Sequence, residues 1–168
     1  MDLMKTKRTL GILTMSDTRF KEGGQDVSGG VIRELTKERY EEVFYRVIPD
    51  DFDTIVAALK EAVGLGCTLI LTTGGTGLSP RDVTPEATRA VIEKVVPGIS
   101  EAMRYHSLQI TPLAMLSRGV SGICGNSLIV NLPGSPKAVR ENLSCVLPAL
   151  VHGLDVLMGE VRECGRGE

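Results

Sequence analysis

The chain has 168 residues and a formal net charge of −2, with 42% hydrophobic and 24% charged residues. This length fits a single domain over residues 1–168, with a polar tail from about residue 160. The composition argues against a disordered, collagen-like or coiled-coil chain. The charge balance gives no sign of nucleic-acid binding, and no apolar stretch is long enough to cross a membrane. Glycine is over-represented, with 19 residues, so the positions of the glycines become the question.

The cysteines give little indication of a metal or redox site. Cys67, Cys124, Cys145 and Cys164 form no C-x-x-C pair, and the chain has only two histidines. Neither a zinc site nor a redox dithiol is therefore indicated. Free thiols are typical of a reducing compartment, so we expect a cytoplasmic protein.

Strands and helices are predicted to alternate along the first half of the chain. Short apolar runs predict buried strands over residues 9–15, 42–48 and 68–73. Apolar side chains at helical spacing predict helices over residues 28–39 and 52–63.

The alternation continues less regularly after the third strand. Residues 85–95 are predicted to form a helix, because Thr84 suits a cap and Pro85 suits a first helical position. A second helix is predicted over residues 99–108. Prolines and glycines divide residues 111–125 into short apolar pieces, to which no element is assigned.

The last predicted elements are a strand over residues 127–132 and a helical stretch over residues 135–157, in which Pro148 predicts a kink or a break into two helices. Strands that alternate with helices predict an α/β fold. We expect a doubly wound, mostly parallel sheet with helices on both faces, a three-layer sandwich. In such sheets, ligands bind beyond the carboxyl ends of the strands.

The sequence T-T-G-G-T-G at residues 72–77 follows one of these strand ends. Glycines there let a ligand approach the backbone, and successive N–H groups can form an anion-binding nest. A Walker motif requires a lysine after the glycines, and none follows here. Pro80 stands where the dinucleotide fingerprint needs its third glycine. The segment predicts a phosphate site, with an ordinary strand-to-helix turn as the alternative. The candidate contacts are Thr73, Gly74, Gly75, Thr76 and Gly77.

Two carboxylates accompany this loop: Asp82 just after it, and Asp50 at a neighbouring strand end. A carboxylate beside bound phosphate would repel it unless a cation intervened, and Mg²⁺ held by one or two carboxylates is the usual solution. Structural alternatives remain, with Asp82 as a first-turn acid and Asp50 as a turn or cap residue, although Asp51 is the better cap candidate. A phosphate site with two carboxylates suits phosphoryl or nucleotidyl transfer.

These residues together resemble molybdenum-cofactor biosynthesis proteins of the Mog/MoaB type. The resemblance covers roughly residues 9–158. The matching segments are T-T-G-G-T-G at 72–77, R-D-V-T-P-E-A at 81–87, Ser16-Asp17, I-P-D at 48–50, N-L-P-G-S-P at 131–136 and P-L-A-M-L-S-R at 112–118.

The resemblance implies a molybdopterin adenylyltransferase, which transfers AMP from Mg-ATP to the terminal phosphate of molybdopterin. It also implies a homotrimer and a separate partner protein that inserts molybdate. Asp50 and Asp82 carry over as the catalytic and metal-binding aspartates. The other residues implied to bind pterin, phosphate or nucleotide are the 74–77 loop, Ser107, Pro133 and Gly134, with Ser16 and Asp17 at the nucleotide rim.

Two other functions remain open. The first is a non-catalytic molybdopterin-binding or carrier module of the same pathway. The second is a flavodoxin-like FMN protein, whose phosphate loop is also rich in Thr and Gly. The FMN alternative is less favoured because the loops contain no aromatic residue to flank a flavin, with Phe20 the nearest candidate.

Overall fold

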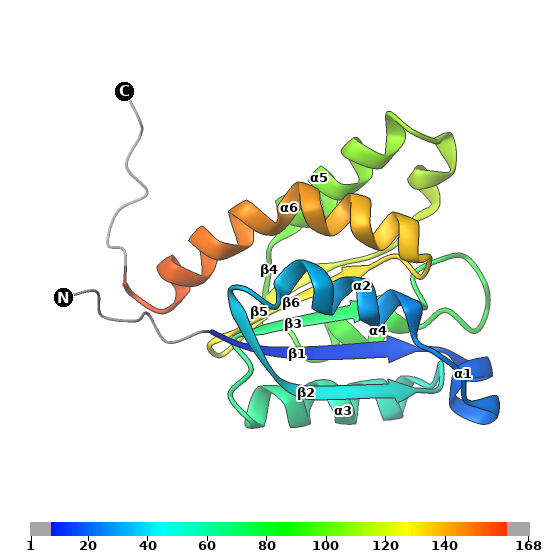
Figure 1. Ribbon diagram of the computed structural model, residues 1–168, viewed down its shortest axis with the longest axis horizontal. Coiled ribbons are helices and arrows are strands. Elements are labelled where there is room, and N and C mark those ends of the chain that lie inside the picture. Colours follow the sequence, from blue (N-terminus) through cyan, green and yellow to red (C-terminus); the bar gives the residue numbers. More distant parts are fainter. Residues whose placement is uncertain (1–7, 161–168) are drawn as a thin grey trace.

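The structure, a computed structural model, describes residues 8–160, and within them one six-stranded sheet lies between two layers of helices (Figure 1). The strands are β1 (Arg8–Met15), β2 (Tyr40–Ile48), β3 (Leu69–Thr73), β4 (Lys94–Val95), β5 (Ser121–Cys124) and β6 (Ser127–Leu132). The helices are α1 (Asp17–Glu22), α2 (Val27–Thr36), α3 (Phe52–Gly64), α4 (Thr84–Arg89), α5 (Pro97–Leu108), α6 (Pro136–Leu157) and the short 3-10 helix η1 (Pro112–Leu116).

The sheet has the strand order β2-β1-β3-β6-β5-β4. The first four strands are parallel, whereas β5 pairs antiparallel with both β6 and β4. The predicted mostly parallel α/β sheet is confirmed. The register aligns the carboxyl ends of the three central strands, since Thr73 pairs with Thr14 of β1 and with Leu132 of β6.

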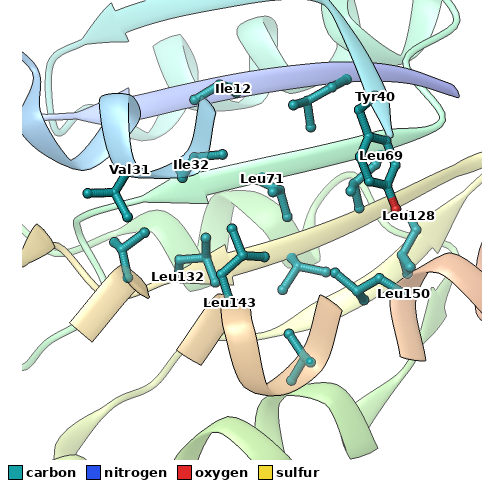
Figure 2. Close-up of a cluster of buried hydrophobic side chains, with 14 of the residues drawn as sticks. Ile12, Val31, Ile32, Tyr40, Leu69, Leu71, Leu128, Leu132, Leu143 and Leu150 are labelled. Carbon is teal, nitrogen blue, oxygen red and sulfur yellow. The ribbon is translucent and has the colours of Figure 1, made fainter. Parts of the chain in front are cut away.

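Side chains along the central strands point alternately to the two faces of the sheet, so they fill two hydrophobic cores, one on each face. In β1, Leu10 and Ile12 pack with α2, α5 and α6, while Leu13 and Met15 pack with α3 and α4. Figure 2 shows the first of these cores, where Leu143 and other residues of α6 meet the sheet. Because β1, β3 and β6 are covered on both faces, their sequences are nearly continuous apolar runs.

Two predictions in the second half of the chain are wrong. The helix expected over residues 85–95 ends at Arg89, and Lys94–Val95 form β4 instead. Backbone pairing prevails over helical propensity there, because Glu93 N donates to Ile123 O at 2.7 Å and extends the edge of the sheet. The predicted cap Thr84 is the first helical residue, and its hydroxyl donates to Gly74 O at 3.0 Å.

Pro148 lies inside a single helix α6, so the break into two helices is wrong, and the kink stays a prediction. Asp51 caps α3, as expected, by accepting from Thr54 N at 2.9 Å. The tail predicted beyond residue 160 lies outside the described residues, as does Cys164. No helix between residues 8 and 160 is long and apolar enough to cross a membrane.

Candidate functional site

The loops that follow β1, β3 and β6 meet at one edge of the sheet. A Cβ on Gly74, where φ is +94°, would lie 2.4 Å from Met15 O, so only glycine lets the loop pass the end of β1. A Cβ on Gly134 would approach Gly74 Cα to 3.5 Å, and Thr73 Oγ1 donates to Pro133 O at 2.6 Å. Because its hydroxyl hydrogen is used in this bond, Thr73 joins two loops rather than offering a free donor.

The glycine loop then lies against the two predicted carboxylates. Gly75 has φ +68°, and a Cβ there would lie 3.0 Å from Asp50 Oδ1 and 2.2 Å from Thr84 Oγ1. A Cβ on Gly77 would lie 2.8 Å from Asp82 Oδ2. The loop backbone therefore lies close to both Asp50 and Asp82.

Asp50 also forms a reciprocal pair of hydrogen bonds with Asp17. Asp17 N donates to Asp50 Oδ2 at 3.2 Å, and Asp50 N donates to Asp17 Oδ1 at 3.0 Å. Burial raises the pKa of Asp50 above its ordinary value, the Asp17 N–H opposes this shift, and the negative charges of Asp17 and Asp82 add to it. Excess negative charge at this point would favour a bound cation.

The donor set suits a metal that substrate also helps to hold. Residues 8–160 contain no group of three or more His, Cys, Asp or Glu side chains arranged to hold a metal ion alone. Mg²⁺ characteristically takes one or two protein carboxylates together with substrate phosphates and water. Asp50 and Asp82, both close to a loop backbone where a Cβ has no space, fit that pattern.

Ser16 and Asp17, the predicted nucleotide rim, are already engaged within the protein. Ser16 Oγ caps α1 by accepting from Arg19 N at 3.2 Å. Arg81 donates to both carboxylate oxygens of Asp17, at 2.9 and 3.0 Å, and this contact lowers the pKa of Asp17. Arg81 is therefore neither a purely solvated loop residue nor a free anion ligand.

A pocket of about 290 Å³ adjoins the other side of the glycine loop, between α5, η1, β6 and the start of α6. Ser107, far from the loop in sequence, lines it, and its hydroxyl donates to Asn142 Oδ1 at 3.0 Å. The predicted site residues that line this pocket are Thr76, Gly77, Ser107 and Pro133. The loop thus separates a largely apolar pocket from the carboxylates.

Arg118 lies against the glycine loop, although no sequence motif predicts a role for it. Its backbone N donates to Thr76 O at 2.9 Å, its Nε to Gly77 O at 2.7 Å and its Nη2 to Asp82 O at 2.6 Å, while Nη1 contacts Glu86. Arg118 holds the glycine loop and the Asp82 segment together. Its partners are mainly backbone carbonyls, which no side-chain pattern reveals. The one available signal was its place in the P-L-A-M-L-S-R segment.

Comparison with known proteins matches residues 11–152 to a family model described as a probable molybdopterin binding domain. The chain belongs to this family. The match confirms the resemblance to this family that the sequence motifs indicated.

Relatives of this molybdopterin-binding domain include proteins with assigned activities. The chain is 43% identical to the molybdopterin adenylyltransferase of Helicobacter pylori (strain ATCC 700392 / 26695), over 89% of this chain and 88% of that protein. It is 46% identical over 86% of its length to the molybdenum cofactor synthesis protein cinnamon of Drosophila melanogaster, but spans only 25% of that longer protein.

A solved structure agrees with the fold. The molybdopterin biosynthesis enzyme MoaB from Thermus thermophilus superposes with a TM-score of 0.85 at 48% identity, over 90% of this chain and 97% of that one.

Proposed function

We propose that this chain is a molybdopterin adenylyltransferase. The observation that carries the proposal is the position of the glycine loop, which has a pocket on one side and Asp50 and Asp82 on the other. An oxygen of the terminal phosphate of molybdopterin attacks the α-phosphorus of ATP. The bond from that phosphorus to the bridging oxygen breaks, and pyrophosphate leaves with the electron pair. The attacking phosphate is already ionised, so the step needs no side-chain base.

Each part of the site has a separate task in this proposal. Asp50 and Asp82 would hold Mg²⁺, which neutralises charge on the reacting phosphates. The backbone from Gly74 to Gly77 orients the phosphates at the junction of the two halves. The pocket holds the pterin, and the rim near Ser16 and Asp17 meets the nucleotide.

A non-catalytic carrier is the second candidate, and the carboxylates argue against it. Binding a phosphate ester gains nothing from two neighbouring aspartates, one with its pKa raised by burial, unless a metal-dependent step follows. An FMN protein is less favoured because none of the residues that line the pocket is aromatic.

The assembly and location are proposals of the same kind. We propose a homotrimer in the cytoplasm that passes its product to a separate molybdate-insertion protein. The described cysteines, Cys67, Cys124 and Cys145, are free thiols, which supports a reducing compartment.

The test is adenylyl transfer by the purified full chain with molybdopterin, ATP and Mg²⁺, followed by chromatography of the product. We expect adenylylated molybdopterin and pyrophosphate in equal amounts, and no product after chelation of the metal.

Asp82→Asn should lower kcat by about 100-fold or more while retaining molybdopterin binding, because it removes a metal ligand and not a pocket residue. Asp53→Asn, an exposed aspartate of α3, is the matched control and should be fully active. Full activity of Asp82→Asn would remove Asp82 from the mechanism.

A further inference from the structure

The pocket beside the glycine loop contains one acidic residue, Glu141, and one basic residue, Arg104. Arg104 is engaged, since its Nη1 donates to Gly119 O at 3.0 Å. The side chain of Glu141 is 27% exposed, and its contact with Lys137 is a loose one of 3.8 Å to a lysine side chain that is 81% exposed. Such a surface pair contributes little and leaves acceptor positions of the carboxylate available.

Glu141 lines the pocket from α6, several residues beyond the start of that helix. The residues of α6 that line the pocket are Ala138, Glu141 and Asn142, which share one face of the helix. The helix begins at Pro136, directly after the turn that packs on Gly74. Glu141 is five residues further along, about 8 Å at 1.5 Å per residue. The pocket is therefore lined by the glycine loop and, about 8 Å along α6 from the helix start, by a carboxylate.

The neighbouring Asn142 cannot take the place of this carboxylate. Its Oδ1 accepts from Ser107, and its Nδ2 donates to Ala138 O at 2.8 Å. Both ends of the amide are used, and the side chain is buried. Glu141 is therefore the strongest free acceptor on the α6 wall of the pocket.

A pterin phosphate can fit the pocket, between the glycine loop and Glu141, in one orientation only. Glu141 would repel the phosphate, whereas the glycine loop offers backbone N–H groups and, in the proposed function, a cation would offset the charges of Asp50 and Asp82, so the phosphate end points to the loop. The opposite edge of every pterin presents two adjacent donors, the ring N3–H and the 2-amino group. Two parallel hydrogen bonds to the oxygens of one carboxylate are the strong, orienting form of such a contact.

We propose that Glu141 recognises the N3–H and 2-amino edge of the pterin and thereby directs the terminal phosphate towards the glycine loop. This inference rests on the proposed function only in taking molybdopterin as the ligand. It assigns substrate specificity to a residue outside the carboxylates and the glycine loop.

The test compares Glu141→Gln with Glu101→Gln, an exposed glutamate of the facing helix α5. Binding is followed by the fluorescence of the ligand, which is not obscured by protein emission because the chain has no tryptophan. The ligands are molybdopterin, free pterin and lumazine, which carries an oxo group where pterin carries the 2-amino group. We expect Glu141→Gln to weaken molybdopterin and pterin binding about 10- to 100-fold. Lumazine binding should strengthen, because an amide N–H can donate to the new oxygen.

Glu101→Gln should match the wild type with all three ligands, and the Tm of both variants should stay unchanged. Equal molybdopterin affinity of Glu141→Gln and wild type, or equal losses for pterin and lumazine, would overturn the assignment.

The same variants separate this inference from the proposed function. If the wild type binds molybdopterin in a Glu141-dependent way but forms no adenylylated product, the transferase proposal fails and the recognition role stands. If transfer proceeds and Glu141→Gln leaves the KM for molybdopterin unchanged, the recognition role fails and the transferase proposal stands. Absence of molybdopterin binding by the wild type would overturn both.

Discussion

Asp50 holds its carboxylate in surroundings that disfavour the charge. Burial is the main reason that its pKa is raised, and the charges of Asp17 and Asp82 act in the same direction. The N–H of Asp17 compensates in part. This arrangement fits a group whose stabilising partner is a bound cation.

The raised pKa leads to a prediction about stability. A carboxyl whose pKa is higher in the folded state destabilises the fold at pH above its ordinary value, near 3.9, and this effect disappears below that pH. Asp50→Asn should therefore raise the Tm at pH 7, by about 1–2 °C, while transfer is lost. Thermal unfolding at pH 7 and at pH 3.5 checks this, with the difference expected only at pH 7. A lower Tm for the variant at pH 7 would contradict it.

The glycine loop is the element on which the site depends. Gly75 has a positive φ, and its α-carbon lies against Thr84 and Asp50, so an added methyl group has no space. Gly75→Ala should lower the free energy of unfolding by about 2 kcal/mol or more, from backbone strain and the steric clash, and should abolish transfer.

Gly30→Ala is the matched control, since Gly30 lies in helix α2 with nothing within 4 Å of the new methyl group. This variant should be stabilised by about 0.5–1 kcal/mol and remain active. Urea unfolding and the transfer assay measure both variants. A Gly75→Ala protein as stable as the wild type would show that the loop relaxes easily.

Arg118 links that loop to the Asp82 segment, so it acts as a positioning residue. Arg118→Lys keeps the charge but cannot reproduce the planar set of donors that reaches Gly77 O, Asp82 O and Glu86 together. We expect a loss of about 1–3 kcal/mol in unfolding free energy. We also expect a fall in kcat of about tenfold or more.

The KM for molybdopterin should change little, because Arg118 itself does not line the pocket. Steady-state kinetics at saturating ATP measure this split, and Arg89→Lys, at the exposed end of α4, serves as the control. An altered KM with unchanged kcat would place Arg118 in substrate binding instead.

At the scale of the whole molecule, the end of α5 and η1 present exposed apolar side chains next to one another. The exposed residues are Tyr105, Leu108, Ile110, Leu113, Met115 and Leu116. Contiguous apolar surface of this kind is typical of protein–protein contacts, and the proposed homotrimer would cover it.

The double substitution Tyr105→Glu and Met115→Glu should convert the trimer to monomers, because charge would be buried without a partner. Light scattering on the purified protein measures the mass. Leu65→Glu, at an equally exposed apolar position after α3, should leave the trimer intact. A wild type that is already monomeric would overturn the trimer, and a trimeric double variant would place its interface elsewhere.

The sequence predicts correctly those elements of the fold that a single clear pattern marks. The buried strands β1, β3 and β6 are continuous apolar runs, and the strand-end rule then located Asp50, the glycine loop and Pro133 at one edge. Sequence reasoning failed for β4, whose exposed residues pair only through backbone hydrogen bonds with a segment 27 or more residues away. Helix α1 is too short and exposed to have an apolar face. The role of Arg118 depends on carbonyl positions that exist only in the folded chain.

The attachment of the site to the central strands has a consequence for amide hydrogen exchange. Thr72, Thr73 and Leu132 are buried in strands with a neighbour on each side, and the site loops start directly from them. Their amides should exchange only when the whole domain unfolds, whereas those of the exposed segment around Leu78 should exchange through local opening. A ligand bound across the loops would then slow exchange in both of these strands together.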